Sequence, residues 1–352
     1  MTNLFKNFPK SSRVLITGGA GFIGSAVIRK LLKDSDCIIF NLDKMSYASN
    51  LQSINFVLNN QDFKKCQRHN LLKIDLSNFS DVESAVQHAD PDFVLHLAAE
   101  SHVDRSIEGP KAFIESNIVG TFNLLESIRT HFENLDFERK SLFRFLHIST
   151  DEVFGSLGKS GIFNELTRYD PRSPYSASKA ASDHLVNAWH HTYDLPILIT
   201  NCSNNYGPWQ NEEKLIPKII YNSINNLSIP IYGDGENIRD WLFVEDHVEG
   251  LIKVLNYGEI GNKYCIGGNE EKTNNEVVKT ICKILDRLVP KENSYSNQIN
   301  YVKDRLGHDK RYSINAAKIK SELNWVPKYS FKEGIEKTVS WYINKYTKQN
   351  NT

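Results

Sequence analysis

Short apolar runs alternate with amphipathic stretches through the first two thirds of the chain. The apolar runs are VLIT (14–17), CIIF (37–40), FVLHLA (93–98), FRFLHIS (143–149) and ILIT (197–200). Stretches of helical length and periodicity cover 22–33, 78–88, 111–132 and 175–194. This alternation predicts repeated βαβ units. Because the strands are apolar throughout, we expect an α/β fold, a doubly wound parallel sheet with helices on both faces.

The pattern loosens after about Pro208. Shorter helical stretches at 213–226, 244–256, 274–288 and 331–346 are separated by loops rich in Gly, Asn and Asp. We therefore predict a dinucleotide-binding Rossmann-type domain over 1–205 and a smaller C-terminal α/β domain, mainly for substrate, over 206–352, with crossings between them allowed. Ligands of doubly wound sheets bind at the carboxyl ends of the strands, so the second domain should close over that edge.

Composition narrows the class of protein. The 352 residues suggest two or three folding units, and 42 basic against 42 acidic side chains give no electrostatic case for nucleic acid or an anionic membrane. The cysteines lack the CxxC spacing of a zinc site and form no evident disulfide framework, so we expect no metal and a reducing cytoplasm. Neither a signal-peptide core nor an apolar membrane span is evident. The cysteines are Cys37, Cys66, Cys202, Cys265 and Cys282.

A glycine turn follows the first predicted strand. Strand RVLIT runs into Gly18-Gly19-Ala20-Gly21-Phe22-Ile23-Gly24 and then into a helix, which is the context in which this motif is informative. Gly18 permits the tight turn, Gly21 lets a pyrophosphate approach the backbone, and Gly24 lets helix and strand pack closely. Free N–H groups at the helix start would face the phosphates. The alternative is a turn that merely links strand to helix.

Asp43 stands nineteen residues beyond Gly24, at the end of the second apolar run. A carboxylate there accepts hydrogen bonds from the adenosine ribose and repels a 2′-phosphate, which favours NAD over NADP. The neighbouring Lys44 weakens that preference because its charge would attract the phosphate.

Tyr175 and Lys179 are four residues apart on the predicted long helix and share one face. A tyrosine is a poor base at neutral pH unless a cation stabilises its phenolate, and Lys179 could supply that charge. The same spacing also occurs on ordinary solvated helix faces, but here it follows a dinucleotide turn.

Thr150, Asp151 and Glu152 follow the strand FRFLHIS, at the edge where substrate should lie. At a turn both carboxylates can reach one pocket, which predicts an acid and base pair. For the acid role, burial or Glu152 must raise the pKa of Asp151. The alternative is that these acids only cap a helix.

Longer motifs resemble one family over nearly the whole chain. The blocks resemble the extended short-chain dehydrogenases and, within them, the dTDP-glucose 4,6-dehydratases; the Thr150-Asp151-Glu152 triplet distinguishes these from the epimerases, which typically carry small hydroxyl residues there. The blocks are GGAGFIGS (18–25), NLDKMSYASN (41–50), LAAESHVDRSI (97–107), HISTDEVFG (147–155), YSASKA (175–180), NCSNNYGP (201–208), EKLIP (213–217), YGDGENIRDWLFVEDH (232–247) and DRLGHD (304–309).

The resemblance implies a lyase reaction that supplies deoxysugars and keeps its NAD tightly bound. Tyr175 takes the proton of the sugar C4 hydroxyl, with Thr150 hydrogen bonded to that oxygen, while hydride passes from C4 to NAD. Glu152 then removes the C5 proton and Asp151 protonates the departing C6 hydroxyl. The hydride returns to C6, and the product is a 4-keto-6-deoxy sugar.

The resemblance also implies the residues that bind each ligand, with Arg239 and His308 holding the diphosphate as a fork and a ring cation. The cofactor set is Gly18, Gly21, Phe22, Ile23, Gly24, Asp43, Lys44, Ser46, Asp75, Leu76, Leu97, Ala98, Ala99, Ser101, Ser116, Tyr175, Lys179 and Asn205. The substrate set is Ser101, His102, Thr150, Asn204, Lys214, Leu215, Pro230, Tyr232, Arg239, Asn274, Asp304, Arg305, Gly307 and His308.

Two positions depart from the family pattern, and one helix suggests assembly. Leu306 replaces a usual proline and could loosen its loop, and Phe154 replaces a usual tyrosine. The helix over 111–132, which carries Phe113, Ile118 and Leu124, is expected to pair with the Tyr175 helix across a homodimer axis, the alternative being ordinary core packing.

Two rival functions remain open at this point. A 4-epimerase, a decarboxylase or another nucleotide-sugar 4,6-dehydratase would share the fold, NAD and Tyr175; the first two have no use for an acid and base at C5 and C6. A noncatalytic NAD-binding scaffold would typically have lost Tyr175 and Lys179, and both are present.

Overall fold

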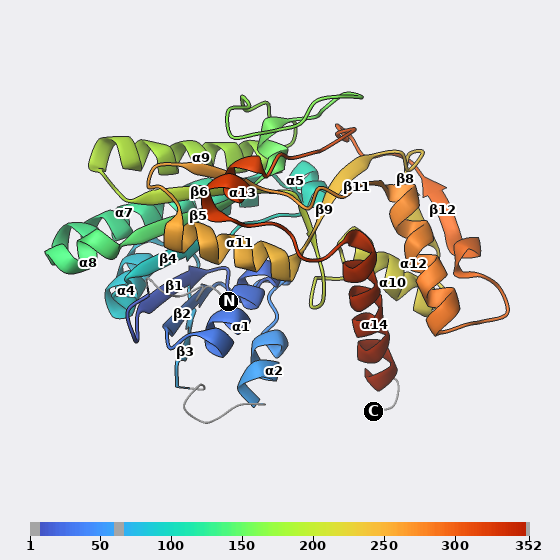
Figure 1. Cartoon of the computed structure of the whole chain (residues 1–352), viewed down its shortest axis with the longest axis horizontal. Helices are drawn as coiled ribbons and strands as arrows, with labels where there is room; N and C mark the ends of the chain where they lie inside the picture. The colour runs from blue at the N-terminus through green and yellow to red at the C-terminus, as the bar shows by residue number, and fades with distance from the viewer. Residues whose placement is uncertain (1–7, 60–66, 350–352) are drawn as a thin grey trace.

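The computed structural model describes residues 8–59 and 67–349; Cys66 and the first seven residues lie outside the described residues. A seven-stranded sheet has the order β10-β6-β5-β4-β1-β2-β3, and every neighbouring pair is parallel. Figure 1 shows this sheet with helices on both sides. Its strands are β1 (Arg13–Thr17), β2 (Ile38–Asp43), β3 (His69–Lys73), β4 (Phe93–His96), β5 (Arg144–Thr150), β6 (Ile197–Cys202) and β10 (Lys263–Ile266).

Both faces of the sheet are buried, as the apolar strands predict. Val14 and Ile16 of β1 pack in one core cluster, and the intervening Leu15 packs in another on the opposite face. The first cluster includes residues of α1 (Phe22–Asp34), α2 (Gln52–Asn59), α11 (Val244–Tyr257) and α13 (Ala317–Leu323). The second includes residues of α4 (Phe79–Ala89), α7 (Gly120–Asn134) and α9 (Pro174–Tyr193). The predicted doubly wound α/β fold is confirmed.

The expected continuous helix over 111–132 is interrupted. After α5 (Val103–Glu108), the chain forms α6 (Lys111–Phe113), the π-helix η1 (Ile114–Val119) and then α7. The wider turn carries the buried Asn117, whose amide donates to Ser178 Oγ at 2.8 Å and to Glu100 O at 3.0 Å. These bonds tie η1 to α9 and to the loop after β4, a tertiary contact that helical periodicity does not encode.

Helix α9 carries Tyr175 and Lys179 and begins at a strong start signal. Ser173 is its N-cap, with a reciprocal capping box to Ser176, and Pro174 occupies the first helical position. The short α8 (Phe137–Leu142) precedes β5, and the 3₁₀ turn η2 (Asp151–Phe154) follows it. Asp151 and Glu152 therefore start the turn that leaves the sheet.

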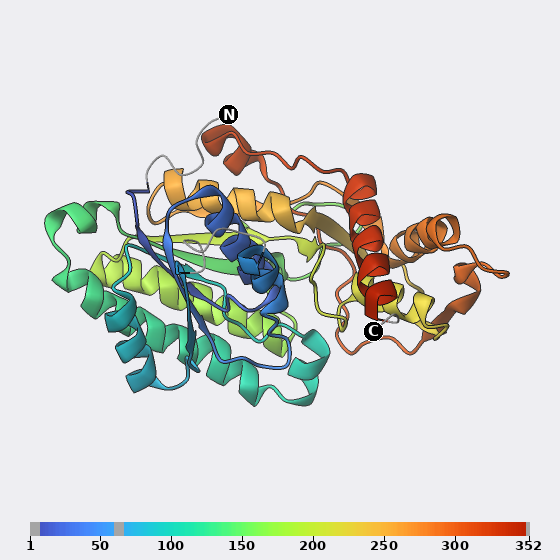
Figure 2. The same ribbon diagram turned by 90° about the horizontal axis from the view of Figure 1, so that it is seen from below.

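The C-terminal unit lies at one end of the sheet in both Figure 1 and Figure 2. It contains a three-stranded sheet of order β11-β9-β7, a parallel pair of β12 and β8, and a separate aromatic-rich core. The predicted helix 274–288 is present with these bounds as α12. The elements are β7 (Asn204–Tyr206), α10 (Leu215–Ile224), β8 (Ile229–Tyr232), β9 (Ile238–Phe243), β11 (Glu271–Thr273), α12 (Asn274–Leu288), η3 (Tyr295–Gln298), β12 (Ile299–Val302) and α14 (Phe331–Gln349).

The chain returns to the first sheet after entering this unit, because β10 pairs with β6 and α11 packs on α1. The domain boundary at 205 stays a prediction. Within the described ranges, no helix combines the length and the apolar character needed to cross a membrane. Four cysteines in those ranges, Cys37, Cys202, Cys265 and Cys282, are buried free thiols.

Candidate active site

One deep cleft lies at the carboxyl edge of the seven-stranded sheet, where the strand order reverses between β1 and β4. All of the residues of the predicted cofactor set line it, from the glycine turn after β1 to Asn205 on β7. Thr150, Asp151 and Glu152 line it after β5. The strand ends thus bring together residues that are widely separated in sequence.

The glycine turn has room only for hydrogen at two of its three positions. Gly18 has a φ of +69°, and a Cβ there would lie 2.7 Å from the backbone of Ala98. A Cβ on Gly24 would lie 2.3 Å from Gly18 O. Helix α1 then starts with no side chain capping its first N–H groups. The turn therefore offers an exposed backbone cradle for a pyrophosphate at a helix N-terminus.

Asp43 is held at the end of β2 by three hydrogen bonds. Its carboxylate accepts from the N–H groups of Ala20 and Met45 and from Ser49 Oγ, at 2.8 to 2.9 Å. The neighbouring Lys44, which also lines the cleft, forms an ion pair with Glu100 at 2.8 Å. The Lys44 charge is thus already partnered, and Asp43 presents the carboxylate to the cleft.

Tyr175 is buried, and Thr150 lies close to it in the lining of the cleft. Burial first, and Glu152 second, raise its pKa well above the usual value. Lys179 Nζ donates instead to Ile148 O at 2.9 Å and lies 3.4 Å from His147 Nε2. Lys179 is therefore not among the groups that lower the pKa of Tyr175 in the protein by itself, and its role in stabilising the phenolate stays a prediction.

Asp151 and Glu152 form a closely spaced carboxyl pair. Burial raises the pKa of Asp151 well above its usual value, and Glu152 and Asp240 add to this. Asp151 Oδ2 is buried with no hydrogen-bond partner among the described residues. Burial also raises the pKa of Glu152, but Arg239, Lys214 and Arg305 oppose the shift. The pair therefore favours a protonated Asp151 beside an ionisable Glu152.

The predicted substrate residues divide into two groups. Ser101, Thr150, Asn204 and Lys214 line the cleft, and Asn204 Oδ1 has no hydrogen-bond partner within the described ranges. Lys214 Nζ donates to Ser101 O at 2.8 Å, which joins the two sides of the cleft. The remaining positions lie outside its described lining; these are His102, Leu215, Pro230, Tyr232, Arg239, Asn274, Asp304, Arg305, Gly307 and His308.

Several of these outer residues meet beyond Glu152. Arg305 forms a two-point ion pair with Asp104 of α5, and Tyr232 OH lies 3.5 Å from the same carboxylate. Arg239 donates to Asp309 O at 3.0 Å and lies over the Tyr312 ring. Two cationic side chains, Arg239 and Arg305, therefore lie near Glu152. Arg305 keeps this ordered contact although Leu306, the departure from the family pattern, is exposed.

His308 differs from its expected charge state. Its ring lies 2.6 Å from Asp304, yet burial first, with Arg239 and Arg305, lowers its pKa below the usual value. The protein alone therefore favours a neutral imidazole, so the predicted ring cation is wrong for this state. A neutral ring can still donate one hydrogen bond.

Comparison with known proteins places this geometry in a family. The family model described as GDP-mannose 4,6 dehydratase matches residues 15–338. The chain is 52% identical over 340 residues to the dTDP-glucose 4,6-dehydratase of Salmonella typhimurium, covering 94% of this chain and 92% of that protein.

The chain belongs to the GDP-mannose 4,6-dehydratase family. Among solved structures of the family's relatives, the dTDP-glucose 4,6-dehydratase of Streptomyces venezuelae, with NAD and dTDP bound, has a TM-score of 0.84 and 39% identity over 95% of this chain and 98% of that one. The dTDP-glucose 4,6-dehydratase of Bacillus anthracis, in complex with NAD, has a TM-score of 0.82 and 39% identity over 96% and 98% of the two chains. The predicted family resemblance is confirmed.

Several residues that line the cleft were not predicted from the sequence. Ser203 directly follows β6, so the rule that ligands lie at strand ends could have found it. Gln210 and Asn211 come from an irregular loop fixed by Tyr342 of α14, which bonds Gln210 O, and no local pattern predicts that contact. The lining residues that were not predicted are Leu42, Ala48, Ser49, Ile74, Glu100, Ile148, Ser149, Cys202, Ser203, Gln210, Asn211 and Glu213.

Proposed function

We propose that this protein converts dTDP-glucose to dTDP-4-keto-6-deoxyglucose and water, with a tightly bound NAD that is regenerated in each turnover. The observation that carries the proposal is the pair of the buried Asp151 and the half-buried Glu152 beside Tyr175 in the cleft. The relatives named above support it, since they are dTDP-glucose 4,6-dehydratases. Such a reaction would supply deoxysugar biosynthesis.

The cleft fits NAD on three observations. The glycine turn leaves space beside the backbone at Gly21, where a Cβ would meet only Gly18 O at 3.2 Å. Asp43 presents a carboxylate at the ribose position. Asn205 Oδ1 is buried without a hydrogen-bond partner in the described part of the chain. When bound, NAD accepts a hydride from the sugar and later returns it.

Tyr175 and Thr150 act on the C4 hydroxyl in this proposal. Both side chains line the cleft near each other, so an oxygen bound between them can receive a hydrogen bond from Thr150 while Tyr175 removes its proton. The raised pKa of Tyr175 makes it a strong base once a nearby positive charge stabilises the phenolate. Oxidation at C4 then acidifies the C5 proton.

Glu152 and Asp151 perform the elimination. Glu152 removes the C5 proton, and its raised pKa makes it a stronger base than an exposed glutamate. Asp151, held protonated by burial, donates its proton to the C6 hydroxyl, which departs as water. Glu152 would then return its proton to C5 as the hydride is returned to C6, which completes the 4-keto-6-deoxy product. Lys214, Arg239 and Arg305 stay near Glu152 as the cationic groups suited to the substrate diphosphate.

The direct test is to incubate the purified protein with dTDP-glucose. We expect the alkali-induced absorbance of a 4-keto sugar and a substrate mass lower by one water, without stoichiometric consumption of NAD. UDP-glucose and CDP-glucose serve as parallel substrates. Formation of the 4-epimer without loss of water would support an epimerase and contradict the proposal, as would stoichiometric NAD consumption or no turnover of any of the three.

Replacing Asp43 with Asn should reduce the affinity for NAD about tenfold or more, because a charge-assisted hydrogen bond to the ribose is lost. The affinity for NADP should fall less. Calorimetric titration of NAD-depleted protein with each nucleotide measures both constants. Asp36→Asn is the matched control, since this exposed residue lies just before the opposite end of β2. Equal NAD affinity in Asp43→Asn and Asp36→Asn would contradict the role of Asp43.

We also infer a homodimer that pairs α7 and α9 with the same helices of a second copy. Phe113 and Leu124 are buried within the chain, so they pack in its own core rather than at an interface. Support comes instead from the apolar side chains Ile114, Val119 and Phe122 on η1 and α7, which are 51%, 39% and 42% exposed. Phe122 packs edge-on against Trp189 of α9, so the exposed surface continues across both helices. Light scattering should give twice the chain mass, and Phe122→Lys should give a monomer. A dimer insensitive to that change would place the interface elsewhere.

We also propose that the protein is located in the cytoplasm. The four buried cysteines in the described ranges are free thiols, a state that a reducing compartment maintains. Cell fractionation followed by immunoblotting tests this location, and recovery from an oxidising compartment would contradict it.

A further inference from the structure

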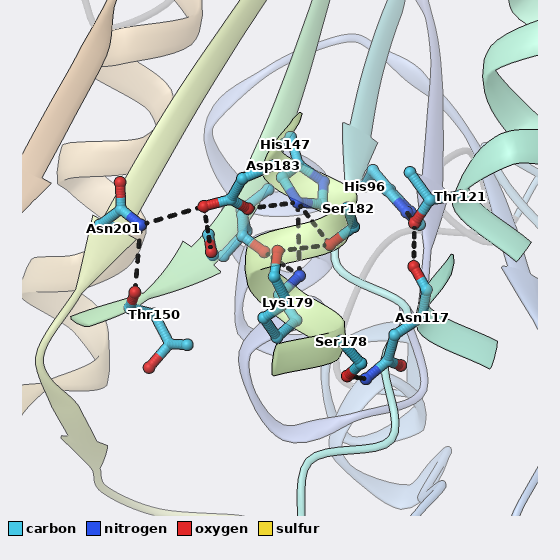
Figure 3. Close-up of polar contacts among 12 residues, drawn as sticks. His96, Asn117, Thr121, His147, Thr150, Ser178, Lys179, Ser182, Asp183 and Asn201 are labelled. Carbon is cyan, nitrogen blue, oxygen red and sulfur yellow. Dashed lines mark hydrogen bonds and ion pairs between the residues drawn. The ribbon is translucent and has the colours of Figure 1, made fainter. Parts of the chain in front are cut away.

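A buried polar network joins α9 to β5 (Figure 3). At its centre is Asp183 of α9, four residues after Lys179 and fully buried. Its carboxylate accepts from Ser149 Oγ at 2.9 Å and from Tyr169 OH at 2.8 Å, and it lies 3.1 Å from His147 Nε2. None of these contacts involves a side chain that the proposed reaction uses directly, so the network needs another explanation.

The charge state of Asp183 follows from these bonds. Burial alone would raise its pKa, but the hydrogen bond from His147, the charge of Lys179 and the bond from Ser149 together hold the pKa below the usual value. Burial and Lys179 lower the pKa of His147 to about 4, so the imidazole between them is neutral near pH 7. An Nε2–H that donates to Asp183 satisfies this geometry. Asp183 is therefore a buried anion.

The negative charge of Asp183 stabilises the positive charge of Lys179. Its ammonium is buried, and burial lowers its pKa, while Asp183 is the main influence that raises it again. Ile148 O accepts one hydrogen bond from Nζ, and the neutral His147 ring stands between Nζ and the Asp183 carboxylate. A buried ammonium without a counter-charge loses its proton readily.

The other ionisable groups around Lys179 do not provide that counter-charge. His96 of β4 and His147 of β5 have pKa values lowered by burial and are neutral. Burial raises the pKa of Cys202 on β6, so its thiol is protonated. Asp151 is likewise held protonated by burial, and Glu152 and Tyr175 lie at the reacting end.

We propose that Asp183 is a positioning residue for the reaction, the fixed counter-anion that keeps Lys179 protonated across the His147 ring and thereby makes the Tyr175 phenolate attainable. This inference rests on the proposed function, in which Tyr175 is the base at C4. Asp183 touches neither sugar nor cofactor in it. Tyr175, Lys179 and Asp183 recur every four residues on α9, so one helix face carries the base, its cation and the anion of that cation.

The test is the ionisation of Tyr175 in NAD-loaded protein without sugar nucleotide. The phenolate is followed by ultraviolet difference absorbance, with Tyr175→Phe as the reference. Asp183→Asn should move the midpoint to higher pH by about one pH unit or more, because loss of the anion lowers the pKa of Lys179 and removes the positive charge beside the phenol. The acid limb of kcat should move by the same amount and in the same direction, with KM unchanged.

Tyr169→Phe is the matched control, because it removes a neutral hydrogen bond to the same carboxylate and keeps the charge. Its Tyr175 midpoint should equal that of the unaltered protein. An equal midpoint in folded Asp183→Asn would overturn the proposal, and so would the same shift in Tyr169→Phe. These readouts need no substrate, so they stand even if dTDP-glucose proves not to be the substrate.

A second comparison applies if Asp183→Asn does not fold. Lys179→Met leaves Asp183 as an uncompensated buried anion, whereas Lys179→Met combined with Asp183→Asn buries neither charge. We expect the double variant to have a higher Tm than Lys179→Met and the same Tyr175 midpoint. A lower Tm, or a midpoint that moves when Asp183 is changed without Lys179 present, would show that Asp183 does not act through Lys179.

Discussion

Asp151→Asn is expected to slow formation of the 4-keto-6-deoxy product about 10²-fold or more, because an amide cannot donate the proton that the C6 hydroxyl needs to depart as water. Glu152→Gln should cause a similar loss by removing the base for C5. The two variants differ in a second readout. In D₂O, Asp151→Asn should still exchange the C5 hydrogen through Glu152, whereas Glu152→Gln should not.

The control for both variants is Asp170→Asn, which removes an exposed carboxylate paired with Arg172 close to the same turn. Its rate should match the unaltered protein. Turnover near normal in Asp151→Asn or Glu152→Gln would refute the elimination mechanism. Because the two carboxyls interact, the pH profile reports apparent pKa values of the pair rather than of one residue.

Asp151→Asn should lower the activity of the protein but raise its free energy of unfolding near pH 8. A carboxyl whose folded-state pKa is raised contributes most below its unfolded pKa, and this contribution is lost as pH rises toward the folded value. At pH 7 to 8 the buried acid therefore lowers the free energy of unfolding, and a neutral amide does not. We expect a higher Tm for Asp151→Asn than for the unaltered protein at pH 8 and a smaller difference at pH 4.

Gly24→Ala is expected to reduce the NAD content of the purified protein to about a tenth or less and to lower its Tm by several degrees. The added methyl would lie 2.3 Å from Gly18 O and 2.8 Å from Gly19 Cα, so the glycine turn must move away from α1. That movement would break the bond from Gly21 N to Gly18 O, 3.1 Å in the intact turn. The pyrophosphate would then lose the backbone cradle.

Gly158→Ala is the matched control, since a Cβ there would meet no atom within 4 Å. Absorbance of the perchloric-acid extract, together with a thermal melt, measures both effects. Stoichiometric NAD in Gly24→Ala, or an equal loss in Gly158→Ala, would mean that close packing at Gly24 does not hold the cofactor site together.

The sequence predicts the central strands well because continuous apolar runs become fully buried strands. β1 and β5 begin and end within one residue of the predicted runs. The edge strand β3 (HNLLK) is half-exposed and carries no such run, and the apolar part of β10 (KYCI) is only three residues long because the strand begins with a lysine. Helical periodicity also does not predict the π-helix η1. This element depends on hydrogen bonds from Asn117 to Glu100 and Ser178, which are distant in the sequence.

In the candidate site, the positions of many residues could be predicted from the sequence, but their charge states could not. Residues at the ends of β1, β2, β4 and β5 could be predicted because parallel strands deliver their carboxyl ends to one edge. Charge states could not, because they depend on burial: the spacing of Tyr175 and Lys179 does not show that Lys179 bonds Ile148 O, nor does the motif show that His308 is neutral. Asp183 lies one helical turn beyond Lys179, so helical spacing is enough to place it on the same face of α9 as Tyr175 and Lys179.

The pairing of β10 with β6 has a consequence for how the chain is made. During synthesis, β6 emerges long before Lys263–Ile266, so its edge next to β10 has no partner until residues well beyond the glycine turn, Tyr175 and Lys179 have left the ribosome. An unpaired apolar edge is a template for intermolecular pairing. Nascent chains released before residue 266 should therefore be aggregation-prone chaperone clients, although they already contain the residues proposed to bind NAD.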